Sequence, residues 1–219
     1  MCLLSGYTRQ QRLLGELLNG VIIINDLICN LSRTDHDQAD VLPLLESNEV
    51  ARVSYIMQIF STASISQRKQ VAAAMMYMAL QFARYGLDSV KDRLMRVHCL
   101  LPSLTCFCDE DSLLADTMYL TEDISETAYL LCEGSLTRAI ALEKAGWADL
   151  LVRSFLARPD DVKSLCLVSK TIHFLLTENS FVWKASFIAA GAEAVIENAL
   201  KKEPFDLTSR YNEILFMLR

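Results

Sequence analysis

Apolar residues recur along most of this chain at steps of three and four, the spacing that buries one face of a helix. Between residues 8 and 32 they are Leu13, Leu14, Leu17, Leu18, Val21, Ile24, Leu27, Ile28 and Leu31. The polar run at 33–40 ends this first predicted helix, and Pro43 suits the first turn of the next. Another apolar stripe follows, formed by Val50, Val53, Ile56, Met57 and Phe60.

The same spacing predicts a helix over 67–84, which we expect Gly86 to end in a left-handed conformation. Its buried face would include Val71, Met75, Met78, Ala79 and Phe82. Methionines also form adaptable binding surfaces, but the periodicity favours the core for these. Helix is expected to resume near Ser89 and to run toward Cys108, with a kink at Pro102. A further helix is expected to start with Thr121 as its cap and acids in its first turn.

The second half of the chain repeats itself at a spacing of 45 residues. Ala145-Gly146 recurs as Ala190-Gly191, and Pro159 recurs as Pro204. The pattern predicts helices over 136–144, 148–157, 162–176, 181–188 and 193–202, with a turn at 158–161. We expect both glycines to occupy equivalent turns where a side chain would clash or strain the backbone.

A period of about 40–47 residues is typical of helical repeats, which bury their apolar faces only against their neighbours. The sequence therefore predicts an all-α fold, a right-handed α-solenoid, with a single domain over 1–219. Residues 1–120 would be degenerate repeats and residues 121–219 clearer ones.

Residues 121–219, and 136–219 most clearly, resemble the armadillo and HEAT repeat families through the two Ala-Gly pairs and the prolines that follow them. The resemblance implies a non-catalytic binding or scaffold module within a larger assembly. The peptide-binding asparagines of armadillo proteins have no regular counterpart here, since Asn179 and Asn198 are isolated.

Two narrower resemblances imply different partners. Residues 121–219 are also similar to the armadillo-type nucleotide-exchange factors, or co-chaperones, of the seventy-kilodalton heat-shock chaperones. The stretch from Leu151 to Phe187, with Leu-Cys-Leu-Val-Ser-Lys at its centre, resembles the tail of an F-box, which would make the chain a ubiquitin-ligase adaptor. No Leu-Pro stands at its front, where an F-box usually starts.

Charge and cysteine content narrow the class of protein. The net charge of the chain is −6, whereas proteins that bind nucleic acids usually carry an excess of basic residues. The seven cysteines are odd in number, without a disulfide pattern, and the first ten residues lack the basic and long apolar segments of a signal peptide. We therefore expect reduced thiols in the cytoplasm and no membrane span.

Candidate chemistry is sparse. His98, Cys99, Cys106 and Cys108 lie close in sequence, but their spacing does not match the paired ligands of a zinc site. No phosphate-binding loop or nucleophile elbow is present. We expect no enzyme activity, no metal and no cofactor. Asp109-Glu110-Asp111 is interpreted as a solvated turn, with a grip on a basic partner as the alternative.

The partner-binding face is predicted on the helices at 148–157 and 193–202, taken as the third helix of each repeat, because third helices line the concave side of armadillo-like arrays. Trp147 directly follows a helix-ending glycine and is expected to be exposed, whereas Trp183 is expected to pack between helices. The predicted partner-binding residues are Asp149, Arg153, Glu193, Glu197, Lys201 and Trp147. A merely solvated face is the alternative.

Overall fold

The computed structural model describes residues 2–34, 42–48, 50–51, 55, 64–95, 114, 119–201 and 207–219. Every regular element among these residues is a helix, so the prediction of an all-α protein is confirmed. The chain divides into two compact units, Met1–Phe107 and Cys108–Arg219, which are described separately.

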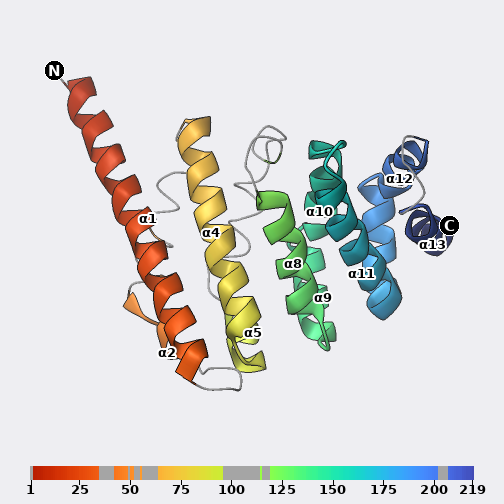
Figure 1. Ribbon diagram of the computed structural model, residues 1–219, viewed down its shortest axis with the longest axis horizontal. Coiled ribbons are helices and arrows are strands. Elements are labelled where there is room, and N and C mark those ends of the chain that lie inside the picture. Colours follow the sequence, from red (N-terminus) through yellow and green to blue (C-terminus); the bar gives the residue numbers. More distant parts are fainter. Residues whose placement is uncertain are drawn as a thin grey trace. The chain divides into compact units, whose positions relative to one another are not determined.

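The first unit is built around two long helices. Helix α1 (Cys2–Thr34) packs along α4 (Ile65–Tyr85), and the short helices α2 (Leu42–Leu45) and α5 (Asp88–Leu94) lie near the end of α4 (Figure 1). Apolar residues of α1 that were predicted at helical spacing, such as Leu17, are buried there. Met75, Met76 and Met78 are also fully buried, which confirms their interpretation as core.

Gly86 ends α4, but not in the predicted way. Its φ is −83° and its ψ is 145°, so the backbone is extended and the prediction of a left-handed cap is wrong. A Cβ at this position would lie 2.5 Å from the carbonyl oxygen of Phe82 and 2.5 Å from a methyl of Val90. Glycine is therefore required here for close packing between α4 and α5 rather than for its backbone conformation.

The second unit contains two successive three-helix segments that follow α8 (Leu120–Cys132). The first segment comprises α9 (Leu136–Lys144), α10 (Trp147–Ala157) and the part of α11 (Val162–Ala189) before Asn179. The second comprises the rest of α11, α12 (Ala192–Leu200) and α13 (Thr208–Leu218). Asn179 has φ −142° and ψ 49°, so α11 is two helices joined at one residue. These bounds closely match the helices predicted from the 45-residue echo.

The two glycine turns have the same conformation. Gly146 has φ 86° and ψ 19°, and Gly191 has φ 79° and ψ 21°. The amide N–H of each glycine donates to the carbonyl three residues earlier, at 2.9 and 3.0 Å. The prediction of equivalent turns is thus confirmed, but a Cβ would meet nothing within 4 Å at either site. The requirement for glycine comes from the left-handed backbone and not from a clash.

The position of Trp147 differs from the one predicted. It is the first residue of α10 and is fully buried, not exposed as predicted. Trp147 follows the left-handed Gly146, and Ala192, which follows the left-handed Gly191, is buried as well. Trp183 is buried as predicted and stacks on Phe187, with ring centroids 5.6 Å apart.

Candidate interaction surface

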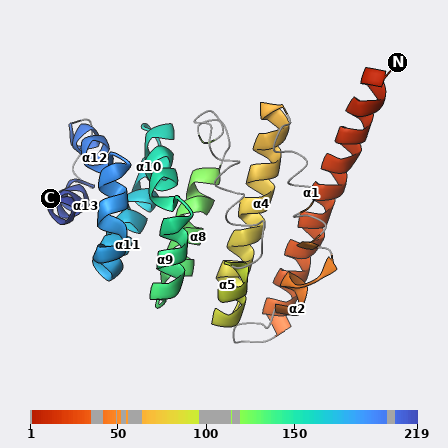
Figure 2. The same ribbon diagram turned by 180° about the vertical axis from the view of Figure 1, so that it is seen from behind.

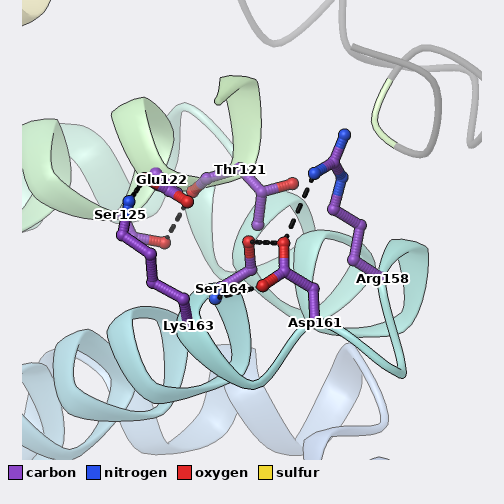
Figure 3. Close-up of polar contacts among 7 residues, drawn as sticks. All are labelled: Thr121, Glu122, Ser125, Arg158, Asp161, Lys163 and Ser164. Atoms are coloured by element: carbon purple, nitrogen blue, oxygen red, sulfur yellow. Dashed lines mark hydrogen bonds and ion pairs between the residues drawn. The ribbon is translucent and has the colours of Figure 1, made fainter. Parts of the chain in front are cut away.

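Polar contacts join the beginning of α8 to the beginning of α11 (Figure 3). Thr121 was predicted to cap α8, but it lies inside the helix, and the cap position is held by Tyr119 at φ 68°. The first-turn acids were predicted correctly. The hydroxyl of Ser125 donates to the carbonyl of Thr121 at 2.9 Å, and that of Thr171 on α11 donates to the carbonyl of Ser125 at 3.1 Å. The Thr171 hydroxyl therefore ties α11 to α8, whereas the Ser125 hydroxyl bonds within α8.

Asp161 caps α11. Its carboxylate accepts from the amide of Ser164 at 3.3 Å and from the Ser164 hydroxyl at 2.9 Å, and Arg158 donates to it at 3.3 Å. The hydrogen bond from the Ser164 hydroxyl is the main cause that lowers the pKa of Asp161. Ser164 is buried and its partner is a carboxylate rather than a histidine. The group therefore stabilises a helix end and lacks the arrangement of an activated nucleophile.

Beyond this cap, partly exposed side chains of α8 pair with side chains of α11. Lys163 donates to Glu122 at 2.7 Å, and this bond raises the pKa of Lys163. The rings of Tyr129 and Phe174 lie 4.4 Å apart between centroids. The ammonium of Lys170 lies 5.9 Å from the centre of the Tyr129 ring, within the range of a cation–π interaction. One stripe of α11 thus faces α8.

A second stripe of α11 faces α13. The imidazole of His173 lies 2.8 Å from a carboxylate oxygen of Glu213. The hydroxyl of Thr177 lies 3.8 Å from the sulfur of Met217. A shallow hollow of about 470 Å³ lies between these two helices, with Phe216 on its lining at 84% exposure.

Together these residues form one surface. It lies on α8, on the part of α11 before Asn179 and on α13. We call it the third-helix face, because the last two are the third helices of the two segments. It consists of Glu122, Glu126, Tyr129, Glu133, Lys163, Lys170, His173, Phe174, Thr177, Glu213, Phe216 and Met217. In both views α11 lies between α8 and α13 (Figures 1 and 2), and it packs against each.

The residues predicted to bind a partner lie elsewhere, because α10 and α12 are the second helices of their segments. This corrects the predicted third position. On α10, Asp149 and Arg153 form an ion pair at 2.8 Å. On α12, Glu193 and Glu197 both pair with Arg219 after α13, the first at 2.8 Å. Lys201 donates to Asn198 at 3.4 Å.

The ion pairs of Glu193 and Glu197 therefore hold α12 to the chain end, and that of Asp149 and Arg153 lies within α10. Trp147 is buried, so a partner could not contact it. The spacing of Lys163, Lys170 and Phe174 on one predicted helix was the signal for the third-helix face. From the sequence alone, this spacing could not be told from that of an ordinary solvent-exposed helix face. The residues that contact it, Glu122 and Tyr129, lie about forty residues earlier in the sequence.

The cysteines give no support for a reactive site within the described residues. Cys132 and Cys166 are free thiols. Burial raises the pKa of Cys132 to about 12, so this thiol is unreactive at neutral pH. Across the described residues no cluster of three metal-ligating side chains occurs. The candidates at 98–99, 106 and 108, and the acidic run at 109–111, lie outside those residues.

Comparisons with protein-family models, with curated proteins and with solved structures find no match for this chain. None of the described helices combines the length and the hydropathy needed to cross a bilayer. The class of the protein therefore has to follow from the packing and the surface of its own helices.

Proposed function

We propose that residues 119–219 form a non-catalytic protein-binding module of α-solenoid type that binds a partner protein through the third-helix face. The observation that carries this proposal is the cross-helix pairing on that face. Exposed and half-buried side chains of three packed helices contact one another from helix to helix, at Glu122–Lys163, Tyr129–Phe174 and His173–Glu213. A surface held in this way is ordered before a partner arrives, which lowers the entropic cost of binding.

The chemistry of the face also supports protein binding. Aromatic and charged side chains alternate across it, with Tyr129 and Phe174 half-buried at the α8–α11 junction and Phe216 exposed on α13. Aromatic residues surrounded by polar groups are the usual source of binding energy at protein interfaces. The predicted face on α10 and α12 differs in its chemistry, because its ion pairs, along α10 and from α12 to Arg219, join charged side chains without aromatic ones between them.

The test compares the two faces directly. One variant combines Lys170→Glu with Glu213→Lys on the third-helix face, and its control combines Arg153→Glu with Glu197→Lys on α10 and α12. All four positions are at least partly exposed, so both variants are expected to fold. Each full-length protein is immobilised, and the proteins it captures from an extract are quantified by mass spectrometry. Seventy-kilodalton chaperones or ubiquitin-ligase scaffolds among them would identify the partner class.

Loss of the same captured proteins from the Lys170→Glu and Glu213→Lys variant alone supports the proposal. Their loss only from the Arg153→Glu and Glu197→Lys variant would show that the α10 and α12 face binds the partner, as the sequence first predicted. Thermal melts of both variants establish that any loss does not come from unfolding.

A further inference from the structure

A second hollow lies on the second unit and shares no residue with the third-helix face. It is formed by the end of α10, the turn before α11 and the outer side of α12, and its volume is about 250 Å³. Phe155 and Leu165 are buried beneath it, and Leu156 and Val162 line it at 56% and 57% exposure. The last two leave apolar surface in contact with water that a partner would remove.

The size of this hollow restricts what it takes. Small-molecule and cofactor sites usually measure about 300–1,000 Å³ and enclose most of their ligand. The hollow here is smaller and open, so it suits one or two side chains of another protein better than a whole cofactor.

One charged residue lines the hollow. Asp160 is exposed, and among the described residues it has no hydrogen-bond or ion-pair partner, in contrast to the neighbouring Asp161 with its bonds to Ser164 and Arg158. A free carboxylate beside exposed aliphatic groups matches a ligand that has an apolar body and a cationic end.

The charge of the whole second unit acts in the same direction. Residues 108–219 contain 18 Asp and Glu against 11 Lys and Arg, whereas residues 1–107 contain 9 against 10. The net negative charge of the chain therefore belongs to the unit that carries the hollow. A field of this sign favours the approach of basic segments and disfavours acidic ones.

We propose that this hollow is a docking site for a protein segment that presents a large aliphatic side chain next to a lysine or arginine. The aliphatic side chain covers Phe155, Leu156 and Val162, and the cation pairs with Asp160. Apolar contact supplies the affinity, and the charge pair selects basic over acidic segments.

The test uses three small probes and the full-length protein labelled at its Leu and Val methyl groups. The probes are N-acetyl-leucyl-arginine amide, N-acetyl-leucyl-glutamate amide and N-acetyl-glycyl-arginine amide. The first is expected to shift the methyl resonances of Leu156, Val162 and Leu165 in a saturable titration. The second is expected to bind more weakly and the third not measurably.

Two variants and a control assign the site. Asp160→Asn should weaken the leucyl-arginine probe about two- to fivefold, the range of an exposed charge pair, and should abolish its advantage over the leucyl-glutamate probe. Ala199→Phe, on the half-buried α12 wall, should fill the hollow and abolish binding. Asp149→Asn on α10 should change nothing.

Equal binding of the arginine and glutamate probes would overturn the charge assignment. Methyl shifts outside the hollow, or binding that survives Ala199→Phe, would overturn the site itself. Asp160→Asn lies on the surface and keeps the test valid even where Ala199→Phe lowers stability. Neither result bears on the third-helix face, because no residue is shared.

Discussion

The two three-helix segments of the second unit share a backbone and differ in the side chains placed on it. Gly146 and Gly191 adopt the same left-handed turn, and a buried residue follows each one. That residue is a tryptophan in the first segment and an alanine in the second. The third helix of the first segment is capped by Asp161, whereas α13 has Leu207 at its cap position and no side-chain cap bond.

This difference separates the features that the two segments share from those that they do not. The turn conformation and the burial of the residue after the glycine are common to both segments. The size of the buried side chain and the helix cap differ, so each is set by its local surroundings. We therefore expect the first segment to depend on particular side chains more than the second.

The largest effect is expected at Trp147, the residue after Gly146, and a small one at its counterpart Ala192. Trp147→Ala should lower the free energy of unfolding by about 3–5 kcal/mol, because it leaves a cavity at a fully buried site. The equivalent change Ala192→Gly should cost about 1 kcal/mol or less. Chemical denaturation followed by circular dichroism measures both. A Trp147→Ala protein with the wild-type midpoint would mean that Trp147 is not in the core.

The glycine turns should respond alike. Gly146→Val and Gly191→Val should each cost about 1–3 kcal/mol, because φ is positive at both positions. Asn tolerates this conformation better, so Gly146→Asn should cost less than Gly146→Val.

Gly15 in α1 is the control for these glycine variants. A Cβ there meets nothing and φ is not positive, so Gly15→Ala should be neutral or stabilising. Equal melting of wild type, Gly146→Val and Gly191→Val would remove the main support for the repeat.

A smaller effect is expected at the cap that only the first segment has. Asp161→Ala should cost about 0.5–2 kcal/mol at neutral pH. Because folding lowers the pKa of Asp161 below its ordinary 3.8, its contribution is complete above that pH and is lost as the pH falls through the lower folded value. Unfolding of the wild type and of Asp161→Ala, compared from pH 7 to pH 2, should show the difference narrowing below about pH 4. A difference that stays constant would exclude the ionised carboxylate as its source.

The smallest effect is expected at the ion pair of the exposed Lys163 with the partly buried Glu122. Lys163→Met should shift the melting temperature less than Asp161→Ala does, because water and salt screen an ion pair whose cation is exposed. Melts at low and high salt measure this. A larger loss than that of Asp161→Ala would mean that the pair, rather than the buried hydrogen bond from the Thr171 hydroxyl to the Ser125 carbonyl, holds α8 to α11.

The positions of the helices in the second unit could largely be predicted from the sequence. Which of their side chains are buried or paired could not. The echo placed α9, α10 and α12 within a few residues, because glycine, proline and apolar spacing act locally. The exposure of Trp147 was misjudged, because its surroundings come from neighbouring helices, and for the same reason the sequence did not show that Glu193 and Glu197 pair with Arg219. The break at Asn179 was predicted as a gap between the helices over 162–176 and 181–188, but the spacing did not show that it is confined to one residue.

Site-specific photo-crosslinking tests the central claim most directly, because it records contact with a partner as a covalent adduct. A benzophenone amino acid replaces Lys170 or Glu213 on the third-helix face, and Asp149 or Glu197 on the α10 and α12 face, in the full-length protein. The account predicts adducts of the same partner from positions 170 and 213 and none from 149 or 197. Adducts from 149 and 197 alone would contradict it.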